Sequence, residues 1–294
     1  KKMPGMEVDK DGTEKSQGQE VQKVYVDGKE FFGTDPKMAT KNLSQDMVES
    51  VQVYDDMSEQ AKFTQMDDGS RLVAELAAVA LPESGARVWD CCAAPGGKSL
   101  MLALRLGGAE ILASDVSAKR LALMSARLRR FPYAERVRCV VADASSGDAQ
   151  RKDGPEGAFD LILCDVPCSG TGTLARNPEI RLRLQPEEWA RQSARQRAIL
   201  HGALQRLAPG GRLVYSTCSL EPEENERVVE AVAAEAGLRR LSVEPLIARL
   251  ADAGTLRQDV AVNLLGSAVK DGALRTIPGV HGCDGFYAVV LERG

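Results

Sequence analysis

The chain has 294 residues, of which 44% are hydrophobic, and its formal net charge is −4. This composition excludes a fibrous or collagen-like protein and lacks the overall positive charge that many nucleic-acid-binding proteins carry. Charges interrupt the apolar stretches well before ~18 residues and the first residues show no secretory pattern, so we expect no membrane-spanning helix and no secretory leader. The seven cysteines include no CxxC pair, which argues against a zinc site or a disulfide framework and favours a reduced, cytoplasmic setting.

The composition changes near residue 70. Residues 1–70 contain nine Lys, no Arg and fifteen Asp or Glu, whereas residues 71–294 contain four Lys, twenty-five Arg and twenty-seven Asp or Glu. Residues 1–22 are too polar to form a core, so we predict a disordered tail. Residues 23–70, which begin KVYVDGKEFFGTDP, resemble part of the plug domain of TonB-dependent outer-membrane receptors of the Bacteroidetes type. The rest of the chain shows no pattern of such a receptor, so we interpret this segment as a fusion or a divergent extension and assign it no function.

From residue 71 onward, apolar strands alternate with amphipathic helices. The expected strands are 87–92, 110–114, 137–142, 159–164, 212–216 and 286–291. The expected helices are 71–81, 98–106, 118–130, 186–207 and 223–235. This alternation predicts the α/β class, with a doubly wound, mostly parallel sheet covered on both faces and a ligand site at the carboxyl ends of its strands.

A glycine pair follows the first expected strand, within residues 90–99 (DCCAAPGGKS). Glycines at a strand-to-helix turn let the backbone approach a ligand closely, although two glycines alone also fit a simple tight turn. The spacing is neither GxGxxG nor a phosphate loop. Asp115 and Asp143 follow the next two expected strands, and either alone could equally be a helix cap. Acidic residues in register at successive strand ends favour a nucleoside site, where a carboxylate accepts ribose hydroxyls.

Two cysteines follow the fourth and fifth expected strands, in residues 165–172 (DVPCSGTG) and 215–219 (YSTCS). A single buried cysteine is usually a small inert hydrophobe. Cys168 and Cys218, however, both lie just past strand ends, where this fold class places its chemistry. The pair is therefore a candidate for nucleophilic catalysis.

Residues 71–294 resemble the catalytic domain of the Sun family of RNA 5-methylcytosine methyltransferases, of the bacterial small-subunit ribosomal RNA type. The resemblance includes both cysteine motifs, the glycine loop, residues 176–179 (RNPE) and residues 284–287 (DGFY). It implies a seven-stranded sheet of the class I S-adenosylmethionine-dependent type, S-adenosylmethionine as cofactor, and an RNA substrate, ribosomal in this type. The bacterial enzymes also carry a helical N-terminal RNA-binding domain, a pattern that residues 1–70 do not show.

The resemblance also assigns roles to residues. Cys218 is implied as the nucleophile that attacks carbon 6 of cytosine, and Cys168 as the group that assists release of the methylated product. Asp165 could hydrogen-bond the cytosine, and Lys98 could either orient nearby carboxylates or be a solvated helix residue. The residues implied to line the S-adenosylmethionine site are Cys92, Ala93, Ala94, Pro95, Gly96, Gly97, Lys98, Asp115, Asp143 and Asp165.

Other interpretations stay open. DNA enzymes attack from the Pro-Cys motif and lack Thr-Cys-Ser, so the presence of both motifs favours RNA over DNA. The alternatives are a methyltransferase acting on tRNA or DNA, or a non-catalytic RNA-binding scaffold. Candidate phosphate contacts, equally compatible with solvated helix faces, are Arg127, Arg129, Arg130, Arg176, Arg181 and Arg183. We expect His281 to be structural, and the protein to be a monomer without a metal.

Overall fold

The computed structural model describes residues 68–82, 87–131, 133–146 and 157–294, together with five short strands nearer the start of the chain. The chain divides into two compact units, Lys1–Asp56 and Met57–Gly294. In the first unit one antiparallel sheet contains three strands and a separate hairpin contains two: β1 (Met6–Val8), β2 (Glu14–Ser16) and β3 (Gln19–Glu20), then β4 (Tyr25–Val26) and β5 (Lys29–Glu30). Apart from these strands and the start of the first helix, the expected tail and plug-like segment lie outside the described residues.

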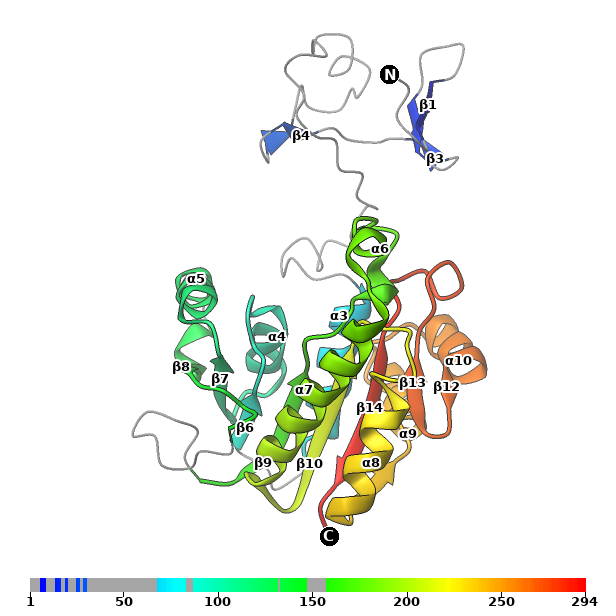
Figure 1. Ribbon diagram of the computed structural model, residues 1–294. Helices are drawn as coiled ribbons and strands as arrows, with labels where there is room; N and C mark the ends of the chain where they lie inside the picture. Colours follow the sequence, from blue (N-terminus) through cyan, green and yellow to red (C-terminus); the bar gives the residue numbers. More distant parts are fainter. Residues whose placement is uncertain are drawn as a thin grey trace. The chain divides into compact units, whose positions relative to one another are not determined.

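A single sheet forms the centre of the second unit (Figure 1). Its strands are β6 (Arg87–Asp90), β7 (Glu110–Asp115), β8 (Val137–Val141), β9 (Phe159–Asp165), β10 (Leu207–Thr217), β11 (Arg239–Leu241), β12 (Val269–Lys270), β13 (Ala273–Arg275) and β14 (Tyr287–Glu292). The order is β12-β13-β14-β10-β9-β6-β7-β8, and β11 also pairs with β14. Strands β8, β7, β6, β9 and β10 are parallel, whereas β14 runs antiparallel to β10.

The expected doubly wound α/β fold is confirmed. The described part of the sheet has nine strands instead of the expected seven, because the short strands β11 and β12 extend it. The helices are α3 (Asp68–Ala80), α4 (Gly97–Arg105), α5 (Ala118–Leu128), α6 (Ile180–Arg183), α7 (Pro186–Leu204), α8 (Glu226–Ala236), α9 (Glu244–Asp252) and α10 (Gln258–Ser267). Among the described residues, no helix has both the length and the apolar character needed to cross a bilayer.

Helices cover both faces of the sheet, so there is a hydrophobic core on each face. Alternate residues of a central strand pack into one core or the other. Leu161 and Leu163 of β9 pack in the core that also holds α3, α4, α5, α9 and α10. Ile162 and Cys164 of the same strand pack in the core that holds α7 and α8. Successive side chains of a strand point to opposite faces, so a strand buried on both sides must be apolar throughout. The uninterrupted apolar run of β9 therefore reflects its central place in the sheet.

Element ends differ from expectation by a few residues. The strand expected at 212–216 begins at Leu207, with a register irregularity before Arg212, and α7 consequently ends at Leu204 instead of residue 207. The helix expected from residue 223 begins at Glu226. Asn225, the residue before it, donates a hydrogen bond from its Nδ2 to the Ser219 carbonyl at 2.9 Å, which fixes it outside the helix.

Candidate active site

The glycine loop joins β6 to α4 and contains the residues expected to line a cofactor site. It is held against β7 by a hydrogen bond from the Ala93 backbone N–H to the Ser114 carbonyl, 2.8 Å. Gly96 has φ +100°, and a Cβ there would lie 2.6 Å from Cγ of Met124 on α5. Both observations require glycine at this position. Gly96 is the N-cap of α4 and provides no side-chain hydrogen bond there.

Two cysteines of this loop, Cys91 and Cys92, pack with Cys164 of β9. The Sγ atoms of Cys91 and Cys164 are 3.3 Å apart, and both side chains are fully buried. The pKa of the Cys92 thiol is raised well above its usual value, first by its contact with Cys91 and then by burial. This shift favours the thiol form of Cys92, and its role toward a cofactor stays a prediction.

Asp90 belongs to the site although sequence reasoning did not single it out. Its side chain is 1% exposed, and its Oδ2 accepts a hydrogen bond from the Ser99 hydroxyl, 2.6 Å. Burial raises its pKa to about 7, against the lowering effect of the Ser99 bond. Its Oδ1 is buried and has no hydrogen-bond partner among the described residues. The signal in the sequence was its position at the end of the first strand, which matches that of Asp115.

Asp115 and Asp143 lie at the ends of neighbouring strands, as expected, but in different environments. Asp115 is 2% exposed, and its Oδ1 accepts from the Ser117 backbone N–H at 2.8 Å and from Arg120 at 2.7 Å. Asp143 is exposed, and its Oδ1 accepts from the backbone and hydroxyl of Ser145 at 2.9 and 2.6 Å. Both carboxylates thus stabilise the turn that follows them, and their role toward a ligand stays a prediction.

Lys98 and Asp165 form an ion pair between the glycine loop and the end of β9. The distance from Lys98 Nζ to Asp165 Oδ2 is 2.7 Å. The Ser216 hydroxyl of β10 donates to the other oxygen, Oδ1, also at 2.7 Å. Lys98 therefore orients a carboxylate instead of extending into solvent, and Asp165 is fixed from both sides.

The two expected cysteines meet at the ends of β9 and β10. These strands pair in parallel with Ser216 opposite Asp165, and the chain brings the Sγ atoms of Cys168 and Cys218 to 3.3 Å. The pKa of Cys168 is raised well above its usual value, first by the contact with the Cys218 sulfur and then by burial. Cys168 therefore keeps its proton, and the pair can share one hydrogen between its sulfur atoms.

The loop after Cys168 crosses the C-terminal part of the chain at Gly172. Its N–H donates to the Cys218 carbonyl at 2.9 Å, and its carbonyl accepts from the Gly285 N–H at 2.9 Å. A Cβ on Gly172 would lie 2.2 Å from the Gly285 oxygen. Beside this crossing Arg176 pairs with Asp284, which joins two motifs that are 108 residues apart in the sequence.

The other residues considered from the sequence lie elsewhere or have local partners. Arg129, Arg130 and Arg181 are exposed, while the side chain of Arg183 lies outside the described ones. Burial lowers the pKa of Arg127, with a smaller contribution from Arg130. His281 accepts from the Ile277 N–H through Nδ1 at 2.8 Å, which is a structural contact within its own loop. Within the described ranges, no group of three or more His, Cys, Asp or Glu side chains is arranged to hold a metal.

The doubly wound, mostly parallel sheet with a glycine loop after its first strand is the fold of class I methyltransferases. The chain belongs to the 16S rRNA methyltransferase RsmB/F family, whose sequence model matches residues 77–292. The Sun-family part of the resemblance is thereby confirmed. The match begins after residues 23–70, so nothing in it supports the resemblance of that segment to a receptor plug.

Relatives and solved structures agree with this family. Ribosomal RNA small subunit methyltransferase B of Vibrio cholerae is 35% identical over 216 residues, 72% of this chain and 42% of the relative. Ribosomal RNA small subunit methyltransferase F of Klebsiella pneumoniae is 34% identical over 208 residues, 70% of this chain and 40% of the relative. The chain thus spans less than half the length of these relatives. The crystal structure of NSun6 from Pyrococcus horikoshii with SFG has a TM-score of 0.59 and 26% identity, covering 75% of this chain and 51% of that one.

Proposed function

We propose that this chain transfers a methyl group from S-adenosylmethionine to carbon 5 of a cytosine in ribosomal RNA, through a covalent adduct with Cys218. The observation that carries the proposal is the 3.3 Å approach of the Cys168 and Cys218 sulfur atoms past the ends of β9 and β10. The names of the relatives, small-subunit ribosomal RNA methyltransferases B and F, support the ribosomal substrate. The reaction is then expected in the cytoplasm.

The residues at the strand ends suit S-adenosylmethionine, which would supply an electrophilic methyl group on a sulfonium. Gly96 allows the tight turn of the loop against α5, and Asp115 places a buried carboxylate at the end of β7. Asp90 adds a buried carboxyl group at the end of β6, held by the Ser99 hydroxyl at 2.6 Å. Support also comes from the NSun6 structure, which was solved with SFG, an S-adenosylmethionine analogue.

Cys218 is the member of the cysteine pair suited to attack. The resemblance to the Sun family assigns the attack to Cys218, and the pKa of Cys168, raised first by its contact with the Cys218 sulfur and then by burial, favours the thiol form of Cys168. Its sulfur forms a bond to carbon 6, and the former double-bond electrons make carbon 5 nucleophilic toward the methyl group. The carboxylate of Asp165, fixed by Lys98 and Ser216, can hydrogen-bond the cytosine ring as charge develops there.

Cys168 acts after the methyl group has moved. The proton on carbon 5 must leave and the bond from carbon 6 to Cys218 must break, which restores the ring double bond. With its sulfur 3.3 Å from that of Cys218, Cys168 can pass its own hydrogen to the departing sulfur and take the proton of carbon 5 in exchange. Both cysteines then end as thiols, and the methylated base is free.

The target cytosine must be unstacked to reach two sulfur atoms at the strand ends, so we expect a single-stranded loop or an open helix as substrate. The test is bisulfite sequencing of RNA from a host with and without the gene. One cytosine in small-subunit ribosomal RNA should lose its protection in the deletion strain and regain it on complementation. Loss of protection in tRNA or DNA alone would overturn the ribosomal assignment. No change in any nucleic acid would favour a non-catalytic scaffold.

A further inference from the structure

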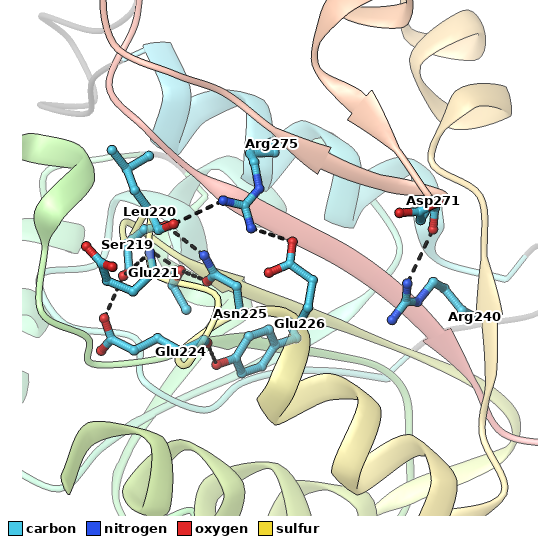
Figure 2. A network of polar contacts seen from close by, with 11 residues as sticks. Ser219, Leu220, Glu221, Glu224, Asn225, Glu226, Arg240, Asp271 and Arg275 are labelled. Carbon is cyan, nitrogen blue, oxygen red and sulfur yellow. Dashed lines mark hydrogen bonds and ion pairs between the residues drawn. The ribbon is translucent and has the colours of Figure 1, made fainter. Parts of the chain in front are cut away.

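A buried carboxylate joins the two cysteine loops. Glu224 is 0% exposed, and Figure 2 shows its side chain reaching toward Ser219 in the turn before α8. Its Oε2 accepts from the hydroxyl of Ser219 at 2.5 Å and from the hydroxyl of Ser169, and its Oε1 accepts from the backbone N–H of Ser169 at 2.8 Å. Ser169 directly follows Cys168, and Ser219 directly follows Cys218. One side chain thus binds the neighbour of each cysteine.

The position of this carboxylate is itself fixed by the sheet and by α7. Gln196 of α7 donates to Glu224 Oε1 at 3.0 Å and to the Pro167 carbonyl, just before Cys168, at 2.9 Å. The buried Tyr215 hydroxyl of β10 donates to the backbone carbonyl of Glu224 at 2.5 Å. Four hydrogens therefore converge on one carboxylate. An ionised carboxylate has about four acceptor positions and no donor, so these four hydrogen bonds satisfy the carboxylate of Glu224 completely.

We propose that Glu224 is a positioning residue for the cysteine pair, whose carboxylate ties the residue after Cys168 and the residue after Cys218 to one point and so sets the separation of the two sulfur atoms. The catalytic consequence rests on the proposed function, but the geometric claim does not. The negative charge of Glu224 also contributes to keeping the proton on Cys168, because it raises the pKa of that thiol.

Substitutions at this position should have graded effects. Glu224→Ala leaves the Ser169 N–H and the Gln196 amide without their acceptor in a buried place, so the two loops separate. Glu224→Gln keeps the length, and its amide oxygen can still accept from Ser169 and Gln196 while its NH₂ group donates to the two serine hydroxyls, which can rotate. The Gln variant should therefore be intermediate. Glu223→Gln is the matched control, because Glu223 lies on the same turn, is 35% exposed and pairs with Arg227.

The first test measures sulfur proximity in the full-length protein without any substrate. Dibromobimane bridges two nearby thiols, and peptide mass spectrometry identifies the bridged pair. We expect Cys168–Cys218 bridging at equal rates in wild type and Glu223→Gln, a rate at least about tenfold lower in Glu224→Ala, and an intermediate rate in Glu224→Gln. Melting temperature and S-adenosylhomocysteine affinity should stay near wild type in the Gln variant.

The second test is turnover on ribosomal RNA. Displacement of a reacting group by about 1 Å can cost ~100-fold in rate, so kcat should fall by about that factor in Glu224→Ala while KM for RNA changes only a few-fold. Bridging at the wild-type rate in a folded Glu224→Ala protein would overturn the proposal. If the Ala variant does not fold, bridging in Glu224→Gln as fast as in Glu223→Gln would overturn it equally. If wild type methylates no RNA, the proposed function fails, and the bridging test still decides the role of Glu224.

Discussion

Gly172→Ala is expected to damage stability and catalysis together, because Gly172 lies between the Cys218 loop and the C-terminal motif. The added Cβ would lie 2.2 Å from the Gly285 oxygen, 2.7 Å from the Gly285 carbon and 2.9 Å from the Cys218 oxygen. Ordinary contacts at such a carbon begin near 3.4 Å, so the backbones must separate by about 1 Å. All three neighbours are backbone atoms, which cannot turn away as a flexible side chain can.

The cost can be estimated from this overlap. Overpacking in a well-packed core typically costs about 1–3 kcal/mol, and backbone neighbours place Gly172→Ala toward the upper end. A loss of about 3 kcal/mol lowers the melting temperature of a domain of this size by about 6–12 °C. A displacement of Cys218 by about 1 Å should also reduce kcat by roughly 100-fold below that temperature.

Differential scanning calorimetry and a methyl-transfer assay at 20 °C measure the two effects. Gly108→Ala is the control, since a Cβ there meets nothing within 4 Å and the backbone is not in the left-handed region. The control should match wild type in both assays. If Gly172→Ala has the same melting temperature and the same kcat as Gly108→Ala, Gly172 does not lie as close to Gly285 and Cys218 as the structure indicates.

Three further predictions follow from the cofactor side of the site and from the domain boundary. The pKa of Asp90 is raised by burial from 3.8 to about 7, so the folded state holds a proton that the unfolded chain releases near pH 4. The free energy of unfolding should therefore fall as the pH rises between these two values, by about 4 kcal/mol at most. Asp90→Asn should remove this pH dependence in thermal melts from pH 4 to 8. An equal pH dependence in both proteins would contradict the burial argument. Asp115→Ala should weaken S-adenosylhomocysteine binding at least tenfold in calorimetry, and more than Asp143→Ala does, because Asp115 is buried and Asp143 is exposed. If the wild-type protein binds NAD tightly and does not bind S-adenosylhomocysteine, the assignment of S-adenosylmethionine as cofactor is wrong. A truncated protein beginning at Asp68, where α3 starts, should fold and bind S-adenosylhomocysteine as the whole chain does, whereas loss of folding would show that the preceding residues are part of the domain.

Much of the fold could be predicted from local pattern. The apolar runs of β7 and β9 and the amphipathic helices between them specify a parallel sheet, and parallel strands bring their carboxyl ends to one edge. This reasoning was enough to place the glycine loop, Asp165 and both cysteines together. It missed the helices α6, α9 and α10. It also missed the short strands β11 to β13, because two or three residues carry too little periodicity to mark a strand.

The finer geometry of the site depends on contacts that are distant in sequence. Arg176 and Asp284 belong to two motifs of the family resemblance, but their pairing appears only in the folded chain. Glu224 stands in the acidic run EPEENE, where nothing distinguishes it from the three other glutamates, which are only partly buried, before its own burial is known. For Lys98 the sequence allowed either a lysine that orients carboxylates or a solvated helix residue. The folded chain decides for the first, because it places Asp165 at the end of β9, the neighbour of β6 in the sheet.

Covalent trapping with the two cysteine variants tests the central claim most directly. Each variant is incubated with substrate RNA and S-adenosylmethionine labelled in the methyl group, and the mixture is run on a denaturing gel. Cys168→Ala should attack and methylate but release slowly, so a labelled, slowly migrating protein–RNA band should accumulate, whereas Cys218→Ala should form no adduct and show no turnover. A band with Cys218→Ala instead of Cys168→Ala would reverse the two roles, and unchanged turnover in both variants would contradict covalent catalysis through this pair.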